Sequence, residues 1–414
     1  MIITFDSAKK LVFAALLFVA LLLMPVSCLG QKKISAQSTA GEFHPGELWY
    51  DTSGTPINAH GGGFLYRDHT YYWFGEFKTA GPGGNAANVG VSCYSSKDLY
   101  HWKNEGIALK VSQDLNSDIV AGSILERPKV LYNQKTKNYV MWFHLELKGR
   151  GYHSARSGVA VADQVAGPYR YLRSLRPNAG VWPEDLPPDQ RKPLSPAEQE
   201  QLAQYSFSGG PPAPLPFPTN LVCRRDFQTG QMARDMTLFL DDDGKAYHIY
   251  ASEENGTLQI SQLTDDFLAP AGHFVRLLVG QFNEAPALFK KDGKYYLFAS
   301  GTTGWAPNAA RSFSANSLRG PWSSLGNPCR GTTAQRKTTF DSQSTYVLPL
   351  AERGGALVFM ADRWRPRNPI DGRYVWLPVL FDNSAPTLEW RDNWSLDTLD
   401  GRVAAGANGE TPAR

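Results

Sequence analysis

The chain of 414 residues is predicted to fold as an all-β protein, a five-bladed β-propeller. Short β-runs and turns recur along it, long periodic helical stretches are absent, and aromatic residues are abundant, with 11 Trp, 18 Tyr and 21 Phe beside 38 Gly and 28 Pro. With 42% hydrophobic residues the chain buries a substantial core, which excludes a disordered or fibrous protein. The net charge of +3 is small and scattered, so no nucleic-acid partner is expected.

The first segment, residues 1–30, is predicted to be a secretory signal. Two lysines precede an apolar run over residues 11–24, which is too short to span a bilayer as a helix. Cys28 stands in a context that resembles a loose bacterial lipobox, so two alternatives stay open: plain cleavage, or a lipid anchor on this cysteine. Either predicts a protein that is secreted, periplasmic or lipid-anchored at the cell surface, with membrane contact only through the anchor.

A hairpin recurs five times in the remaining chain. A turn rich in Asp, Gly, Lys or Asn joins one β-run to a second run rich in Tyr, Trp and Phe. The copies are GGGFLYRDHTYYWFGE from Gly61, RPKVLYNQKTKNYVMWFHLE from Arg127, DMTLFLDDDGKAYHIYAS from Asp235, EAPALFKKDGKYYLFAS from Glu284 and STYVLPLAERGGALVFMADRW from Ser344. A weaker pair of strands follows each copy, the last within YVWLPVLFDNSAPTLEW. Five four-stranded units therefore predict one domain over residues 45–395, with residues 396–414 as a tail.

A proline-dense stretch at about residues 174–221 separates the second unit from the third. It contains PEDLPPDQRKPLSPAEQE and GGPPAPLPFP, which cannot form a central strand because proline lacks an N–H donor. We interpret it as a surface insertion, with one short helix in SPAEQEQLAQY that begins at the Ser195 cap and Pro196. Two roles stay open, a loop without function and a lid or cleft wall.

A polar residue stands at the start of each predicted innermost strand. In a propeller these strands surround the central channel, so their polar side chains are expected to converge into one pocket. The alternative is that each residue caps its own strand or pairs with a neighbouring arginine. The residues are His60, Glu126, Asp235, Glu284 and Gln343.

Paired carboxylates beside aromatic side chains suit hydrolysis of a glycosidic bond, in which one group protonates the leaving oxygen while another supports attack on the sugar. A second carboxylate close by also raises the pKa of the acid through like-charge repulsion. The motifs GxSxG, GxxxxGK[ST] and HExxH are absent, which argues against serine, phosphate-transfer and zinc-protease chemistry. The three cysteines after the signal are widely spaced, and no metal site is predicted from them.

The segments RDMTLFLDDDGKAYHIY and NEAPALFKKDGKYYLFAS resemble glycoside hydrolase family 43, a family of five-bladed propellers. The resemblance extends over nearly the whole mature chain apart from the insertion. It implies that Glu284 is the general acid and that Asp235 modulates the pKa of this acid and orients the sugar. The chain departs from the common family pattern at NAHGGG, where most members place an Asp base and this sequence has His60.

The segments AHGGGFLYRDHTYYWFGE, LERPKV, SGTTGWAPN, FDSQSTYV and ADRWRP resemble the subgroup that includes exo-β-1,3-galactanases. This resemblance implies an inverting, exo-acting hydrolase of β-1,3-galactan, such as the backbone of plant arabinogalactan. It also implies that Glu126 and Gln343 line the site. Two assignments of the base stay open: Gln343 as its imidic-acid tautomer, and Glu126 acting directly on water.

Five further positions are expected to contact the sugar. Trp305 would stack on a pyranose face or, alternatively, lie buried between blades. Glu76 would accept a hydrogen bond from an axial hydroxyl or, alternatively, form a salt bridge with Lys78 or Arg127. The five positions are Glu76, His60, Tyr152, Thr302 and Trp305.

Two rival functions stay open beside the galactanase. One is another specificity within the family, that of an arabinofuranosidase or xylosidase. The other is a non-catalytic carbohydrate-binding propeller, although the retained pair of Glu284 and Asp235 argues against it. The expected partner is a polysaccharide or oligosaccharide. No cofactor is expected, and although some family members hold a cation near the propeller axis, no oxygen-ligand loop in this sequence identifies one.

Overall fold

The computed structural model describes residues 41–205, 216–371 and 373–400, which belong to one compact unit, Thr39–Arg414. The predicted signal segment with Cys28, and the predicted tail beyond residue 400, lie outside the described residues. Antiparallel sheets dominate the described part of the chain, so the all-β prediction is confirmed. In this part no helix has the length and apolar character needed to cross a membrane.

The first four repeats each form a four-stranded antiparallel sheet whose strands pair in chain order. The strands of the first two sheets are β1 (His60–Arg67), β2 (Thr70–Lys78), β3 (Asn88–Ser96), β4 (Lys103–Lys110), β5 (Ile124–Tyr132), β6 (Tyr139–Glu146), β7 (Arg156–Ala162) and β8 (Arg170–Leu175). Those of the next two are β9 (Met236–Leu240), β10 (Ala246–Ser252), β11 (Thr257–Leu263), β12 (Pro270–Leu277), β13 (Glu284–Lys291), β14 (Lys294–Ser300), β15 (Arg311–Ala315) and β16 (Ser323–Gly326).

The strands of the fifth repeat belong to two three-stranded sheets, one of which is completed by a strand that precedes the repeat, so the prediction of a five-bladed propeller is wrong. Counted by its sheets, the propeller is six-bladed. One sheet contains β18 (Gln343–Leu350), β19 (Ala356–Arg363) and β20 (Arg373–Pro378), and the other contains β17 (Cys329–Arg330), β22 (Ala385–Glu389) and β21 (Leu380–Asp382). β20 ends at Pro378, and β22 pairs in parallel with β17, which precedes this repeat in the chain.

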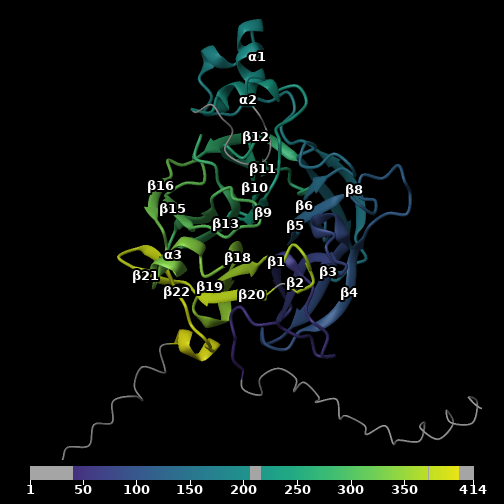
Figure 1. The fold of residues 1–414 in the computed structure, drawn as a ribbon, viewed down its shortest axis with the longest axis vertical. Helices are drawn as coiled ribbons and strands as arrows, with labels where there is room; N and C mark the ends of the chain where they lie inside the picture. Colours follow the sequence, from purple (N-terminus) through teal and green to yellow (C-terminus); the bar gives the residue numbers. More distant parts are fainter. Residues whose placement is uncertain (1–40, 206–215, 372, 401–414) are drawn as a thin grey trace, which may run out of the picture. The chain divides into compact units, whose positions relative to one another are not determined.

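The innermost strands form a ring around the centre of the propeller (Figure 1). Going round the ring, β1 lies next to β5, β5 next to β9, β9 next to β13, β13 next to β18, and β18 next to β1. In the small sheet of β17, β22 and β21, the strands β21 and β22 lie at the periphery (Figure 1). The starts of the ring strands, where the sequence places its polar residues, therefore meet around one channel.

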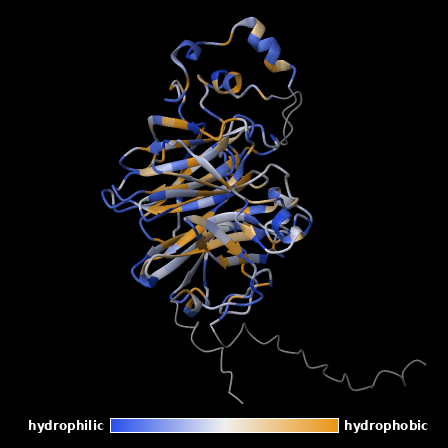
Figure 2. Ribbon diagram, turned by 90° about the vertical axis from the view of Figure 1, so that its left-hand side faces the viewer, coloured by the Kyte–Doolittle hydropathy of each residue, from blue (hydrophilic) through white to orange (hydrophobic). Residues whose placement is uncertain are grey.

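Aromatic rings fill the contact between the first sheet and the sheet that contains β18. The ring of Trp73 lies 5.1 Å from that of Trp376 and 5.3 Å from that of Trp102. Phe43 and Trp394 join the two ends of the propeller through backbone hydrogen bonds in both directions, and their rings contact each other in a tilted arrangement at 4.5 Å. Figure 2 shows hydrophobic residues gathered along the strands and hydrophilic ones in most of the turns. Much of the aromatic content is thus explained by packing between sheets.

The proline-dense insertion contains short helical elements next to β12 (Figure 1). The predicted helix is confirmed as α1 (Pro196–Ala203), which begins at the Ser195 cap with a reciprocal hydrogen-bond pair between Ser195 and Glu198. The sequence analysis missed a second helix, α2 (Thr219–Arg225), at the end of the insertion. The remaining short elements are η1 (Gly84–Ala87), η2 (Pro188–Gln190), α3 (Thr333–Thr338), η3 (Ala351–Arg353) and η4 (Leu396–Asp400).

Candidate functional site

A cavity of about 270 Å³ opens where the ring strands begin. Seven of the nine side chains that the sequence analysis selected line it, so residues far apart in the chain are brought together as expected. The lining residues are Glu76, Asn85, Glu126, Arg127, His144, Tyr152, Arg234, Asp235, Asn255, Glu284, Gly304, Trp305, Gln343 and Trp364.

β-Bulges aim two of the acidic side chains at the cavity. The pairing register of β5 shifts after Glu126, and that of β13 shifts after Glu284. The next residue in each strand, Arg127 or Ala285, has a left-handed backbone with φ of 56° or 52°, and a proline follows. A bulge bends its strand and redirects the side chain beside it. The short motifs ERP and EAP are therefore the local sequence signal for these two positions.

Glu284 carries the carboxyl group best suited to be an acid at neutral pH. Burial raises its pKa to about 8, and the negative charge of Asp235 acts in the same direction. The positive charges of Arg127 and Arg234 oppose this rise without cancelling it. Its Oε1 accepts a hydrogen bond of 2.7 Å from Asn255 Nδ2, which fixes the orientation of the carboxyl group.

Arg127 connects three of the ring strands. Its guanidinium donates to both carboxylate oxygens of Asp235, at 3.1 Å from Nε and 2.9 Å from Nη2. It also donates to Gln343 Oε1 at 2.6 Å and to the Ser344 carbonyl at 3.1 Å. The Asp235 carboxylate in turn accepts from the Ala285 N–H at 3.0 Å, directly beside the acid. One buried cation thus fixes both the carboxylate and the amide of the predicted site.

The hydrogen-bond partners of the Gln343 side chain fit an ordinary amide, with donors at its oxygen and an acceptor at its nitrogen. Its Oε1 accepts from Arg127 and from Trp364 Nε1, the latter at 2.9 Å. Its Nε2 donates to Ser300 Oγ at 2.9 Å. Because both partners of Oε1 can only donate, a proton on this oxygen would face two donors.

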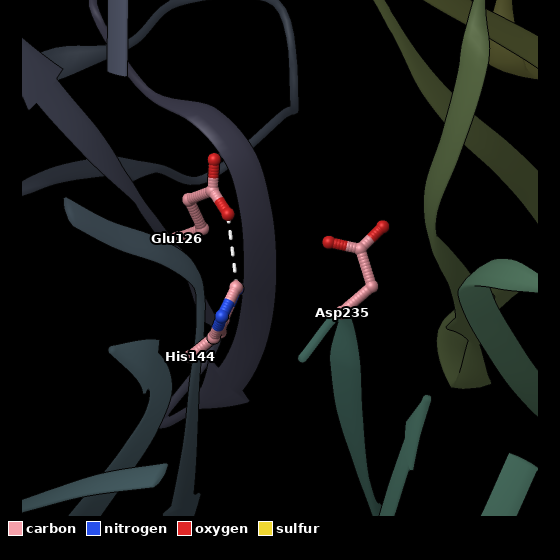
Figure 3. A group of neighbouring side chains, drawn as sticks. All are labelled: Glu126, His144 and Asp235. Atoms are coloured by element: carbon pink, nitrogen blue, oxygen red, sulfur yellow. Dashed lines mark ion pairs between the residues drawn. The ribbon is translucent and has the colours of Figure 1, made fainter. Parts of the chain in front are cut away.

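Glu126 forms an ion pair with His144, at 2.9 Å from Oε2 to Nδ1 (Figure 3). Burial alone would raise the pKa of Glu126, but the contact with His144 and its positive charge outweigh burial and hold the pKa at about 2. His144 lies between two acids, since its Nε2 is 3.0 Å from Glu146 Oε1. Burial alone would lower the pKa of His144, whereas these two acids raise it to about 10. Glu126 is therefore ionised at neutral pH while Glu284 is not.

The raised pKa of His144 predicts a pH-dependent stability. A group whose folded pKa lies above its ordinary value of 6.5 stabilises fully below that value, and this contribution is lost as pH rises toward about 10. In Glu146→Gln the folded pKa falls, so the decline in melting temperature should finish at a lower pH than in the wild type. The exposed His101→Gln change should leave the wild-type curve unaltered. A Glu146→Gln curve parallel to the wild type at every pH would contradict the assignment.

The second oxygen of Glu126 faces polar groups at the cavity rim. Tyr152 Oη donates to it at 2.9 Å, and Asn85 Nδ2 also donates to it. Asn85 Oδ1 accepts from Lys78 Nζ at 2.7 Å, and the same ammonium pairs with Glu76. The alternative interpretation of Glu76 as a salt-bridge partner of Lys78 is therefore confirmed, although Glu76 also lines the cavity.

Two aromatic residues stand at the mouth of the cavity. Trp305 is 39% exposed, and its ring meets that of Trp364 edge-on at 5.7 Å. Its exposure contradicts burial between blades and leaves a face free for a ligand. Tyr152 is equally exposed, at 39%. The rim thus combines apolar faces with the polar floor described above.

Two of the predicted contact residues do not line the cavity. His60 is buried, with its ring 5.2 Å from that of Tyr374 and 5.5 Å from that of Trp364, and so packs against β20 instead of facing the cavity. Thr302 is buried beside the loop that carries Trp305. For His60 the strand-start pattern was misleading: β1 is bulged after His60 as β5 and β13 are after their acids, yet the imidazole packs against Tyr374 and Trp364.

Glu126, His144 and Asp235 offer ligand atoms within 4.8 Å of one another, the spacing of a cation site (Figure 3). Side chains of the protein offset the negative charges of the two carboxylates, since Arg127 donates two hydrogen bonds to Asp235 and His144 forms an ion pair with Glu126. The arrangement is therefore explained by ion pairs between side chains.

Besides Gly304, six lining residues were not predicted as site residues. Arg127 follows Glu126 directly in ERP, and Trp364 lies in the quoted ADRWRP, so neighbouring motifs were available as signals for these two. The others come from loops or second strands, where nothing in the hairpin pattern marks them. The six are Asn85, Arg127, His144, Arg234, Asn255 and Trp364.

Comparisons with known proteins show which family the chain is similar to. The family model described as glycosyl hydrolases family 43 matches residues 217–348. A family 43 β-1,3-galactosidase solved with galactodeoxynojirimycin is 49% identical, with a TM-score of 0.76, over 85% of this chain and 100% of that chain. An exo-β-1,3-galactanase from Phanerochaete chrysosporium, solved with β-1,3-galactotriose, is 33% identical, with a TM-score of 0.68, over 87% of this chain and 69% of that one.

A curated relative shows a more distant likeness. A β-D-galactofuranosidase from Aspergillus niger is 28% identical over 130 residues, which are 29% of this chain. The match spans 37% of the length of that relative.

Proposed function

Because this chain belongs to glycosyl hydrolase family 43, we propose that it is an inverting, exo-acting glycoside hydrolase that removes galactose from β-1,3-linked galactan. The observation that carries the proposal is the division of protonation states in one cavity. The pKa of Glu284 is raised to about 8, while that of Glu126 is held at about 2. A protonated acid and an ionised carboxylate are the pair that glycosidic hydrolysis needs.

Glu284 is proposed as the general acid that protonates the leaving oxygen. Its burial keeps the proton on the carboxyl at neutral pH, and Asn255 holds one oxygen so that the other is left to face the substrate. Asp235 is proposed as the modulator, since its charge acts on the pKa of Glu284 and its carboxylate is fixed by Arg127. Each of these roles depends on a contact that the cavity supplies before substrate arrives.

Glu126 is proposed as the group that accepts the proton of the attacking water, with Gln343 orienting the sugar or water. The charge of Glu126 is secured by His144, whereas Gln343 Oε1 already accepts from Arg127 and Trp364. The imidic-acid alternative for Gln343 requires a proton on that oxygen, in a place that now holds two donors. The two assignments are separated by the variants described in the Discussion.

Asp235→Asn should move the basic limb of the pH–rate profile to lower pH. Removing the like charge lowers the pKa of Glu284, and it also frees the positive charge of Arg127 to act in the same direction. The profile of kcat/KM against pH measures this shift, with the exposed Asp243→Asn as the control that should leave it in place. A profile that shrinks without shifting would restrict Asp235 to orienting the sugar.

The exo mode follows from the size of the cavity. At about 270 Å³ it lies just below the usual range of small-molecule sites, which suits one terminal sugar better than a chain passing through. Trp305 and Tyr152 at the rim are proposed as contacts for that sugar and the unit next to it. The purified protein, incubated with β-1,3-galactan and with aryl arabinofuranosides and xylosides, should release galactose from the first and little from the others. Preference for a pentoside would overturn the assignment of galactan as the substrate but not the assignment to the family.

A location outside the cytoplasm is also proposed, on the strength of the apolar run and the lipobox-like context of Cys28. Fractionation of cells that express the full chain tests it. Membrane association that is lost in Cys28→Ser would identify a lipid anchor, and soluble export of both forms would identify plain cleavage. Retention of the unprocessed chain in the cytoplasm would overturn the proposal.

A further inference from the structure

The turn at residues 253–256 has an unfavourable backbone conformation that needs support from its surroundings. Glu253, Glu254 and Asn255 are consecutive non-glycine residues with left-handed φ values of 52°, 56° and 64°. Each such residue costs free energy and persists only where its surroundings enforce it. The turn carries Asn255, whose amide donates to the proposed acid Glu284 at 2.7 Å. Whatever holds this turn therefore also places the hydrogen bond on the acid.

The proline-dense insertion supplies part of that support, through its helix α2. Asn220 Oδ1 accepts from Arg276 Nη1 at 2.7 Å, and the same guanidinium donates to both oxygens of Glu253 at 2.7 and 2.9 Å. Arg225, at the end of α2, donates to Glu254 Oε1 at 3.1 Å. The two acids of the turn are thus each tied to α2, one directly and one through Arg276.

Apolar packing adds to these ion pairs. The insertion has a small core of Leu202, Phe217 and Val222, against which Phe282 also packs. The Phe217 ring lies so close to Gly256 that an added Cβ there would come within 3.0 Å of it. Phe282 stands two residues before Glu284, so the same cluster borders the turn and the start of β13.

The support also reaches the opposite wall of the cavity. Arg234 Nη2 donates to Glu254 Oε2 at 2.9 Å and to the Tyr152 carbonyl at 2.8 Å. Arg176, at the start of the insertion, donates to the carbonyls of Ser154 and His153 at 3.0 and 3.1 Å. The insertion thus contacts the loop that carries Tyr152 as well as the turn that carries Asn255, and both of these residues line the cavity.

We infer that the described part of the insertion, together with the whole of α2, is a clamp that positions the turn at residues 253–256, and through Asn255 the acid Glu284. Asn220 and Arg225 are positioning residues in this account, since neither lines the cavity. The inference rests on the proposed role of Glu284 as an acid, and not on the identity of the sugar.

The clamp has a predictable effect on the acid. A hydrogen bond donated to a carboxyl group favours its charged form, and Asn255 Nδ2 donates such a bond to Glu284. Loosening the turn removes this donor, and the pKa rises. The basic limb of the pH–rate profile should therefore move to higher pH, opposite to the shift expected for Asp235→Asn.

The test uses Asn220→Ala, which changes no charge, with Arg225→Met as a second variant and Asn255→Ala as the reference. Each should move the basic limb of the pH–rate profile to higher pH by about half a pH unit, the size of shift expected from one lost hydrogen bond. In the Asn255→Ala background, Asn220→Ala should add no further shift, because both act through the same contact. Arg191→Met is the matched control, since among the described residues the Arg191 guanidinium donates to the carbonyls of Leu186 and Glu184, both within the insertion.

The profiles are recorded on whichever glycoside the wild type hydrolyses, so a wrong sugar assignment does not affect them. The titration of the Glu284 carboxyl, followed by NMR of protein labelled with ¹³C-glutamate and assigned with Glu284→Gln, gives the same shift without any substrate. Folded Asn220→Ala and Arg225→Met proteins whose limb and carboxyl titration match the wild type would overturn the clamp. A shift that adds fully to that of Asn255→Ala would overturn it as well.

Discussion

Glu284→Gln is expected to lower turnover on β-1,3-galactan about a hundredfold or more while substrate binding survives. The amide keeps the size of the side chain and can still accept the hydrogen bond from Asn255 Nδ2. What it loses is the acidic proton, which the carboxyl keeps at neutral pH because burial raises its pKa to about 8. Kinetics with the polysaccharide, together with calorimetric binding of β-1,3-galactotriose, separate the two effects.

A matched variant and a second substrate sharpen this test. Glu200→Gln, an exposed residue of α1, should leave turnover unchanged. An aryl glycoside with a good leaving group needs less protonation, so Glu284→Gln should lose much less activity on it than on galactan. Full activity of Glu284→Gln on galactan would refute its role as the acid.

Glu126→Gln is expected to abolish hydrolysis of galactan, the second large effect. The change removes the carboxylate that His144 keeps ionised and leaves the neighbouring hydrogen bonds from Tyr152 and Asn85 available. In Glu126→Ala the same loss opens space beside His144, and added azide should restore turnover by forming a glycosyl azide of inverted configuration. The azide product, identified by mass spectrometry and NMR, is the measurement.

Variants of Gln343 distinguish the competing base. If Gln343 only orients, Gln343→Ala should weaken turnover and binding together, since it removes a partner of Arg127 and Trp364. If instead Gln343 takes the proton of water, Gln343→Ala should be as inactive as Glu126→Gln, and Gln343→Glu should retain some activity as an ordinary carboxylate. Comparable partial losses from Glu126→Gln and Gln343→Ala would mean that neither residue acts alone.

The sequence was sufficient to predict the all-β class and most of the cavity, because both follow from repetition. Each hairpin places its polar residue at the same end of an inner strand, so Glu126, Asp235, Glu284 and Gln343 converge once the strands form a ring. The number of sheets was not predictable in this way. It depends on the parallel pairing of β17 with β22, two short strands separated by a whole repeat.

The supporting residues were hidden for a related reason. His144 lies mid-strand in a run of aromatic residues, and only the fold shows that Glu126 and Glu146 contact its two nitrogens. Asn255 lies in a turn whose left-handed residues are not glycines, so the sequence before Gly256 does not indicate this backbone conformation. Arg127 was considered only as a salt-bridge partner, because its role depends on reaching two other strands of the ring.

The anomeric configuration of the first product tests the central claim most directly. The purified protein is mixed with β-1,3-galactotriose, and proton NMR spectra are recorded before mutarotation equilibrates the released sugar. The account predicts that galactose appears first as the α-anomer, with the disaccharide as the other early product, because an inverting enzyme attacks from the face opposite the acid. Galactose that appears first as the β-anomer would contradict the inverting mechanism and the role of Glu126, and the absence of any released galactose would contradict the proposed function itself.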